Sequence, residues 1–341
     1  MQVLRSALEK LVAGQDLTQQ EARDVMGALM SGEAGQASVG ALLAALRLKG
    51  ETAQEIAGMA RGLREAAVTI SPAVEGLTDT CGTGGDRRGT FNISTTAAFI
   101  ACGAGLKVAK HGNRSVSSDC GSADVLEELG VRIEMEPARV QECIEQVGMG
   151  FLFAPRFHPA MRHVMPARRE LGIPTIFNYL GPLANPAGAP RQLLGVSGTH
   201  MAGRLAEVLA ELGCERALVV HGSDGLDEAT LCGTTTVHRV EGGHLSTFEL
   251  DPQDLGLEPV AEDELRGGGP QRNAAITLEV LEGAPGPKRE VACLNAGLAL
   301  VAGGVTGSVP EGLEMSRRSI DSGAALGRLD ALRQFSREAP A

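Results

Sequence analysis

The chain contains 341 residues, of which 43% are hydrophobic and 21% charged, as in an ordinary globular protein long enough for two domains. Its formal net charge of −11 argues against a protein whose whole surface binds nucleic acid. The seven cysteines are odd in number and lack the spacing of zinc ligands, so we expect reduced thiols and a cytoplasmic location. No stretch has the roughly 18 uninterrupted apolar residues of a membrane span, and the N-terminus lacks the apolar stretch of a signal peptide.

Residues 1–70 are predicted to be helical. Two capping boxes, Thr18-x-x-Glu21 and Thr52-x-x-Glu55, mark helix starts, and apolar residues recur at helical spacing after each of them and also between them. Short Gly-containing turns separate the helical patterns. The apolar stripes predict either the core of a helical bundle or a surface between subunits.

From Leu77 onward, short apolar runs alternate with helical patterns, which predicts a mostly parallel sheet. The candidates for strands or buried helices are 106–109, 131–135, 151–154, 193–196, 217–220 and 291–299. The helical patterns fall near 94–104, 122–129, 138–147, 200–212 and 312–326. The Gly- and Pro-rich sequence of 267–287 is expected to include exposed loops.

The predicted fold class is α/β, with a small all-helical domain and a larger α/β domain whose mostly parallel central sheet is flanked by helices. Pro- and Gly-rich turns between 159 and 190 interrupt the alternation. We expect this region to cross between the domains, with a segment of about 165–190 returning to the helical domain of 1–70. The large domain then comprises 71–164 and 191–341.

A glycine-rich run, 79–86, follows a short apolar stretch and precedes a polar run, 92–96, at the start of an Ala-rich helical pattern. Glycines let backbone N–H groups approach phosphate oxygens, and a helix N-terminus favours negative charge. The spacing matches neither the dinucleotide-binding loop nor the triphosphate-binding loop. Alone, the run is equally a tight turn between a strand and a helix.

A second polar run follows the apolar run 106–109 and reads Lys110-His111-Gly112-Asn113-Arg114, with Ser117 and Ser118 beyond it. It therefore lies at the predicted C-terminal end of a strand, which is where ligands bind in open α/β sheets. Alone, it is equally a solvated basic turn. Because two strand ends both offer anion donors, the sequence favours a shared phosphate site.

A pair of carboxylates, Asp227 and Glu228, follows the apolar run 217–220. Mg²⁺ prefers hard oxygen ligands and usually keeps several waters. An isolated Asp-Glu pair is most often part of a solvated face, but a third strand-end loop favours a metal site. His221 begins the same loop and is assigned no role.

Several runs, taken together and in order, resemble the anthranilate phosphoribosyltransferase family. They lie at 82–86, 92–95, 110–114, 153–155, 158–161, 177–186, 224–228 and 319–323. Each run is weak alone, whereas their order and spacing along nearly the whole chain are highly specific.

The resemblance implies a homodimer that uses 5-phosphoribosyl 1-diphosphate (PRPP) as donor, anthranilate as acceptor and Mg²⁺ as cofactor. It implies that PRPP contacts Gly82, Gly85, Asp86, Thr90, Asn92, Ser94, Thr95, Lys110 and Ser122. It places anthranilate beside Gly82, His111, Asn113, Arg168 and Gly181, and Mg²⁺ on Ser94, Asp227 and Glu228. Arg168 also fits on chemical grounds, since a guanidinium pairs with a carboxylate.

The implied reaction joins the phosphoribosyl group to the amine of anthranilate in tryptophan biosynthesis. An aromatic amine is a neutral nucleophile at pH 7, so no general base is assigned. Loss of diphosphate builds oxocarbenium-like charge on the ribose, so stabilising the leaving group is the main expected task.

Two other functions remain as alternatives: a pyrimidine nucleoside phosphorylase of the same fold, and a non-enzymatic relative that binds nucleic acid. The pair Asp227-Glu228 and the run 178–186 favour the transferase over the phosphorylase. The negative net charge disfavours a nucleic-acid partner, and no membrane partner is expected. One departure from the family pattern is Arg87-Arg88, where small or mixed residues are expected; these arginines either strengthen anion attraction or face solvent.

Overall fold

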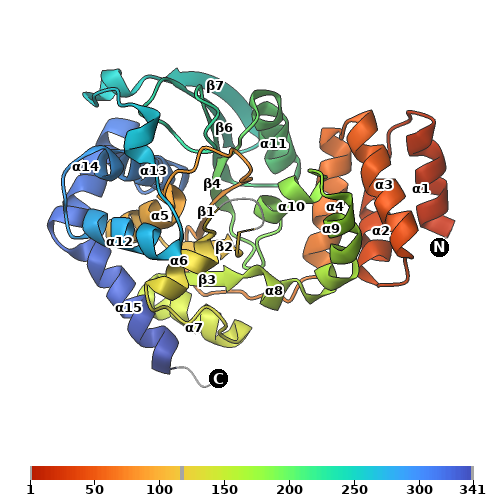
Figure 1. Ribbon diagram of the computed structural model, residues 1–341, viewed down its shortest axis with the longest axis horizontal. Coiled ribbons are helices and arrows are strands. Elements are labelled where there is room, and N and C mark those ends of the chain that lie inside the picture. Colours follow the sequence, from red (N-terminus) through yellow and green to blue (C-terminus); the bar gives the residue numbers. More distant parts are fainter. Residues whose placement is uncertain (1, 116–118, 339–341) are drawn as a thin grey trace.

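The N-terminal region folds into a helical bundle in the computed structural model, which describes residues 2–115 and 119–338. Its helices are α1 (Gln2–Val12), α2 (Gln19–Met30), α3 (Gln36–Lys49) and α4 (Ala53–Glu65). Both predicted capping boxes are present, because the Thr18 and Thr52 hydroxyls accept from the backbone N–H groups of Glu21 and Glu55. The bundle lies at one end of the long axis of the molecule (Figure 1).

The rest of the described chain is built around one seven-stranded sheet in the order β3-β2-β1-β4-β5-β6-β7. The strands are β1 (Thr78–Gly82), β2 (Val108–Gly112), β3 (Met149–Phe153), β4 (Arg191–Gly195), β5 (Arg216–Gly222), β6 (Thr235–Glu241) and β7 (His244–Leu250). β1 to β5 pair in parallel, whereas β6 and β7 are antiparallel additions at one edge. The predicted fold class, a helical domain and a larger domain with a mostly parallel sheet, is confirmed.

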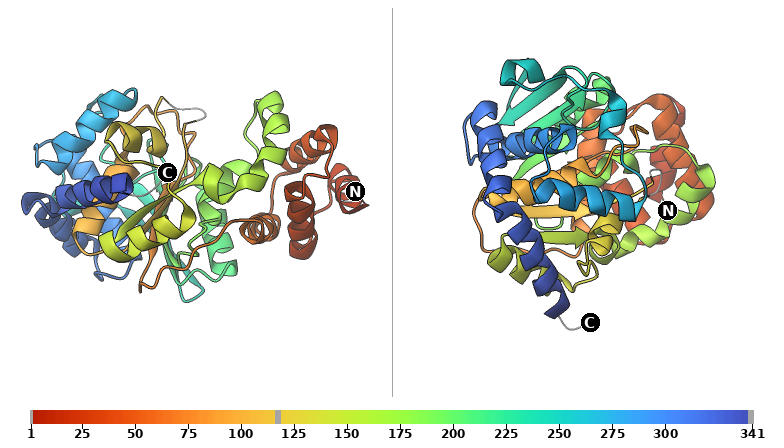
Figure 2. Two further views of the ribbon diagram at one scale, coloured as in Figure 1. Left: turned by 90° about the horizontal axis from the view of Figure 1, so that it is seen from below. Right: turned by 60° about the vertical axis from the view of Figure 1, so that its left-hand side comes forward.

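The two faces of the sheet contribute to different hydrophobic clusters, because side chains alternate along each strand. Leu193 and Leu218 pack with the helices of one face. These helices are α5 (Ile93–Gly103), α6 (Ser122–Glu128), α7 (Pro137–Val147), α12 (Pro270–Leu281), α13 (Pro287–Ala302), α14 (Val309–Asp321) and α15 (Ala324–Glu338). Leu194 and Val219 instead pack with α11 (Thr199–Glu211) in the cluster that also holds the bundle. Figure 2 shows the C-terminal helices and the bundle at opposite ends.

The segment after β3 runs across to the bundle through short helices. They are α8 (Ala154–Phe157), the 3-10 helix at Pro159–His163, α9 (Met165–Leu171) and α10 (Phe177–Leu183). Val164 and Leu180 lie in the same hydrophobic cluster as the bundle helices. The two green helices α9 and α10 accordingly lie beside α3 and α4 (Figure 1). The domain limits given above stay a prediction.

One predicted segment is wrong. The run 131–135 is irregular, although Val131 and Ile133 are buried, because its Arg132 N–H donates to the Ser336 hydroxyl of α15 (3.0 Å) rather than to a strand. The region 267–287 includes exposed loops as predicted, around Gly269 and at 284–286, but most of it is α12, which starts with a proline in its first turn and buries one face. The run 291–299 is a buried helix, as one of its two interpretations allowed.

The antiparallel hairpin of β6 and β7 was not predicted. Gly242 and Gly243 form its two-residue turn, and both have positive φ, 56° and 81°. The helix predicted at 312–326 is interrupted after Ser322 by Gly323, whose φ is 76°. Among the described residues, no helix combines the length and the apolarity that a bilayer crossing requires.

Candidate active site

The predicted polar runs meet at one edge of the sheet. The glycine run begins within β1 and continues past its end, the basic run begins within β2, and the carboxylate pair lies in the loop after β5. Because these strands are parallel, their C-terminal ends lie on the same edge. β2 and β3 lie on one side of β1, and β4 lies on the other side. The strand order therefore reverses between β1 and β4, and ligands of such sheets usually bind at the C-terminal ends of the strands at this point.

The carboxylate loop rests directly on two paired glycines at the ends of β1 and β4. Gly82 and Gly195 are partners in the register of these strands. A Cβ on Gly195 would lie 1.6 Å from the Asp227 carbonyl oxygen, and one on Gly82 would lie 2.4 Å from an Asp227 carboxylate oxygen. The Gly84 N–H also donates to Asp227 Oδ2 (2.7 Å). Missing side chains therefore let Asp227 reach the glycine run.

The two carboxylates are partly buried, and their negative charges are disfavoured. Burial and the neighbouring Asp86 raise the pKa of Asp227 to about 7. Burial and the charge of Asp227 raise the pKa of Glu228 well above its ordinary value, although a backbone hydrogen bond from Ser94 opposes this. Like charges that share a desolvated site need a cationic partner.

This donor set fits Mg²⁺. The paired carboxylates and the hydroxyl of neighbouring Ser94 offer hard oxygen ligands, and crowded negative charge favours a divalent cation. Within residues 2–115 and 119–338, no group of three or more His, Cys, Asp or Glu side chains is arranged to hold a metal alone. A usual Mg²⁺ site in enzymes that bind phosphorylated substrates combines one or two carboxylates with substrate phosphates and water.

Lys110 places a cation beneath the same loops. Its side chain is 2% exposed and donates to the Thr80 carbonyl and to the Ser94 hydroxyl, the latter at 3.3 Å. Burial lowers the pKa of Lys110, whereas the charges of Asp79 and of the Asp227-Glu228 pair raise it. The ammonium thus joins β1 and α5.

The N-terminus of α5 has no side-chain cap. Asn92 stands at the cap position, the Ile93 N–H donates to the Phe91 carbonyl (2.7 Å), and the Ser94 N–H bonds Glu228. The Thr95 hydroxyl is buried without a hydrogen-bond partner among the described residues. Gly84 and Gly85 have positive φ, 65° and 79°, which turns the preceding loop toward this helix.

Other residues predicted to contact PRPP are held in place by bonds to or between backbone groups. The Ser122 hydroxyl donates to the Asn113 carbonyl (3.4 Å), which joins the loop after β2 to the start of α6. Thr90 forms an isolated bridge with Arg266. Arg114 turns outward to ion pairs on α6, with Asp124 and Glu127. Ser117 and Ser118 lie outside the described residues.

The residues predicted to contact anthranilate are only partly brought together. His111 Nδ1 hydrogen-bonds the Gly181 carbonyl (3.0 Å), which joins β2 to α10. The Arg168 guanidinium lies over the Phe177 ring, 5.0 Å from its centre, at the start of α10. No described carboxylate forms an ion pair with Arg168, and burial lowers its pKa. No contact joins Arg168 to Asn113 or Gly82.

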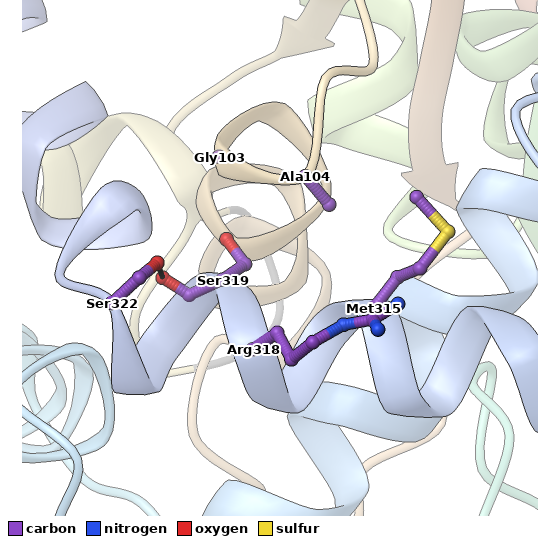
Figure 3. Close-up of a pocket in the computed structure, with 6 residues that line it drawn as sticks. All are labelled: Gly103, Ala104, Met315, Arg318, Ser319 and Ser322. Atoms are coloured by element: carbon purple, nitrogen blue, oxygen red, sulfur yellow. Dashed lines mark hydrogen bonds between the residues drawn. The ribbon is translucent and has the colours of Figure 1, made fainter.

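A separate shallow pocket lies at the opposite end of α5. Figure 3 shows its lining residues, Gly103, Ala104, Met315, Arg318, Ser319 and Ser322. The Ser319 hydroxyl donates to the Ile100 carbonyl (2.8 Å), and a Cβ on Gly103 would lie 2.3 Å from that hydroxyl. The run 319–323 therefore packs α14 against α5, away from the strand-end loops.

Comparison with known proteins decides the family. A model of the glycosyl transferase family, a/b domain, matches residues 75–326, and the model of the family's helical bundle domain matches residues 5–67. The chain is 52% identical to an anthranilate phosphoribosyltransferase of Desulfatibacillum aliphaticivorans, across 97% of this chain and 98% of that protein. The chain belongs to the anthranilate phosphoribosyltransferase family.

Solved structures of anthranilate phosphoribosyltransferases share the whole fold. The enzyme of Thermus thermophilus is 46% identical, with a TM-score of 0.93 over 97% of this chain and 99% of that one. A structure from Saccharomyces cerevisiae in complex with PRPP and Mg is 30% identical, with a TM-score of 0.89 over 98% of both chains. Another yeast structure, in complex with 4-fluoroanthranilate, has a TM-score of 0.88 at 30% identity, over 98% of both chains.

Three buried polar residues of this family member were given no role in the sequence. The Asp79 carboxylate accepts from the His111 N–H (3.2 Å), and burial raises its pKa to about 6. His158 places its ring 5.1 Å from that of His111, and Asn273 donates to Asn92 (2.9 Å). Asp79 was identifiable as an acid in an apolar strand, whereas only the tertiary structure reveals the other two.

Proposed function

We propose that the chain transfers the 5-phosphoribosyl group of PRPP to the amine of anthranilate, giving N-(5-phosphoribosyl)anthranilate and diphosphate in tryptophan biosynthesis. Family membership over nearly the whole chain supports this activity. The observation that carries the proposal for the site is the packing of Asp227 against Gly82 and Gly84, with Glu228 beside Ser94. This arrangement brings acidic ligands to a loop suited to phosphates.

The donor would lie on the loop after β1 and the start of α5. The N–H groups around Gly85, the Asp86 carboxylate and the start of α5 suit a phosphorylated sugar with hydroxyls. The unpartnered hydroxyl of Thr95 supports the same placement. The other residues proposed to contact PRPP are Gly82, Thr90, Asn92, Ser94, Lys110 and Ser122.

Mg²⁺ would be held by Asp227 and Glu228 with Ser94, together with diphosphate oxygens. When bound, the ion supplies Lewis-acid stabilisation of the leaving diphosphate. Asp227 and Glu228 hold their carboxylates at the strand-end edge, and the buried Lys110 side chain lies near enough for their charges to raise its pKa against the lowering effect of burial. These groups are preorganised by the fold, so they stabilise charge that grows on the leaving group without rearranging.

Anthranilate would approach between the large domain and α10. The Arg168 guanidinium, which has no carboxylate partner among the described side chains, suits the anthranilate carboxylate. Gly181 has open space where a Cβ would stand, and His111 fixes its carbonyl. Asn113 is exposed at the same strand end. These contacts would orient the amine toward the ribose C1, opposite the leaving group, without a general base.

We further propose a cytoplasmic homodimer without nucleic-acid or membrane partners. In each chain, the helical domain would comprise 1–70 with the segment of about 165–190. The remainder, 71–164 and 191–341, would form the large domain. Gel filtration with light scattering tests the dimer.

Anthranilate fluorescence tests the activity directly. Loss of signal that requires the protein, PRPP and Mg²⁺ together is the expected result. No loss with folded protein and several divalent metals would contradict the proposal. Phosphorolysis of thymidine or uridine would then be assayed, because a pyrimidine nucleoside phosphorylase shares the fold.

A further inference from the structure

Two amide side chains, buried Asn273 and half-buried Asn92, connect three loops around the proposed PRPP site. The Gly268 N–H donates to Asn273 Oδ1 (2.8 Å), and Asn273 Nδ2 donates to Asn92 Oδ1 (2.9 Å). Asn92 Nδ2 in turn donates to the Cys120 carbonyl (3.2 Å). Asn273 is 1% exposed, on the first turns of α12. The amide relay, as we name these three bonds, therefore runs from one backbone group to another.

The backbone groups at its two ends fix the direction of the amide relay. A backbone N–H can only donate, so Asn273 must turn its oxygen toward Gly268 and its nitrogen toward Asn92. A backbone carbonyl can only accept, so Asn92 must turn its nitrogen toward Cys120. One hydrogen of Asn92 Nδ2 is then committed to Cys120, and the second has no acceptor in the described part of the chain. Asn92 is thus held as a donor, which suits an anionic ligand.

The amide relay also sets the spacing of the loops that it joins. Gly267 and Leu265 bond along the chain segment 89–91, so the loop before α12 lies over the end of the glycine run. A Cβ on Gly267 would lie 2.5 Å from Asn273 Oδ1, so this loop is packed tightly on the amide. Cys120 lies two residues before Ser122, another residue proposed to contact PRPP. Asn273 therefore acts on both sides of the proposed PRPP site, although it belongs neither to the loop of Asn92 nor to the loop of Cys120.

We propose that Asn273 is a positioning residue for PRPP, which orients the Asn92 amide as a donor and fixes the loops at the starts of α5 and α6. This inference rests on the proposed function. It assigns a role to a residue of α12 that lies outside every motif used to identify the family. Its effect should appear in donor binding rather than in acceptor binding.

A double-mutant cycle tests whether Asn273 acts through Asn92. PRPP binding in the presence of Mg²⁺ is measured by calorimetry for Asn273→Ala, Asn92→Ala and the double variant, along with KM for both substrates. Each single change should weaken PRPP binding about tenfold, as expected for a broken buried hydrogen bond, with KM for anthranilate within about twofold. The double variant should be no more than about threefold worse than Asn92→Ala, because coupled residues are not additive.

Thr277→Val is the matched control. Thr277 lies one turn along α12, is fully buried, and bonds Thr96 of α5 (3.0 Å), so its loss breaks the same helix pair without touching Asn92. This variant should bind PRPP like the unmodified chain. If Asn273→Ala does not fold, the cycle is run with Asn273→Asp, which keeps the shape of the side chain but replaces its donor by an acceptor.

Three outcomes would overturn the inference. They are additive losses of about 100-fold in the double variant, equal losses in Thr277→Val, and unchanged PRPP binding in both Asn273 variants. A chain with unmodified sequence that neither binds PRPP nor consumes anthranilate would instead refute the proposed function. The two failures are therefore distinguishable in one set of experiments.

Discussion

Replacing Gly195 by alanine should displace the carboxylate loop. The added Cβ would lie 1.6 Å from the Asp227 carbonyl oxygen, and real Cβ contacts essentially never fall under 3.0 Å. Gly195 is held in register against Gly82 of β1 and Val220 of β5. The strand is therefore the rigid partner, and the loop of Asp227 must move.

The expected cost is large for activity and moderate for stability. A displacement of about 1 Å in a catalytic group can lower turnover by about 100-fold. The Asp227 carboxylate would move together with the Asp227 carbonyl. Its distances to the Gly84 N–H and to the Glu228 carboxylate would therefore both change. We expect kcat/KM to fall about 100-fold and the Mg²⁺ concentration for half-maximal activity to rise. Overpacking should lower the free energy of unfolding by about 1–3 kcal/mol.

The assay is anthranilate fluorescence over a Mg²⁺ titration, with urea unfolding of the same samples. Gly198→Ala, three residues further along the chain, is the matched control. The atoms nearest to its new Cβ would lie 4.0 Å away. Gly198→Ala should keep its Mg²⁺ response. If Gly195→Ala retains activity within about twofold and the same Mg²⁺ response, the packing argument is refuted.

Three further predictions concern single sites. Asp227→Asn combined with Glu228→Gln should lower kcat/KM at least about 100-fold and remove the Mg²⁺ dependence of the reaction. The same change should raise the melting temperature of the Mg²⁺-free protein, because it removes two crowded charges. Intact turnover would contradict the metal assignment. Arg168→Ala should raise KM for anthranilate about 10- to 100-fold with KM for PRPP nearly unchanged, and Arg168→Lys should restore it only in part; equal effects on both substrates would contradict the assignment. Burial lowers the pKa of His158 from 6.5 to about 4, so the unfolded chain binds more protons in this range and stability falls as pH drops through it. His158→Gln, whose amide can donate to the same Ala184 carbonyl, should remove up to about 1.4 kcal/mol per pH unit of that slope in urea titrations, and an identical slope would argue against a neutral buried His158.

Local signals in the sequence predicted much of the fold. The capping boxes at Thr18 and Thr52 are each defined by four consecutive residues, and the structure contains both. The hairpin after β5 also had a local signal, Gly242-Gly243 between alternating residues, which was overlooked. The misreading of 131–135 has another cause, since alternate burial there comes from packing against α15 rather than from a ladder.

The site divides in the same way. The strand-end rule predicted that the runs after β1, β2 and β5 share one edge, because a parallel sheet has one such edge. Gly195 lay within a strand candidate and gave no hint that Asp227 rests on it, because this contact joins residues 32 positions apart. Asn273 was hidden for the same reason, since its bond to Asn92 joins residues 181 positions apart.

The cluster that α11 shares with the bundle has a consequence for cooperativity. Side chains such as Leu43 of the bundle, Leu205 of α11 and Val219 of β5 exclude water together. Melting the bundle alone would strip one face of the sheet of its cover and expose both sides of that interface to solvent. A calorimetric scan should therefore show one endotherm rather than two, with the N-terminal helices and the sheet losing structure at the same temperature.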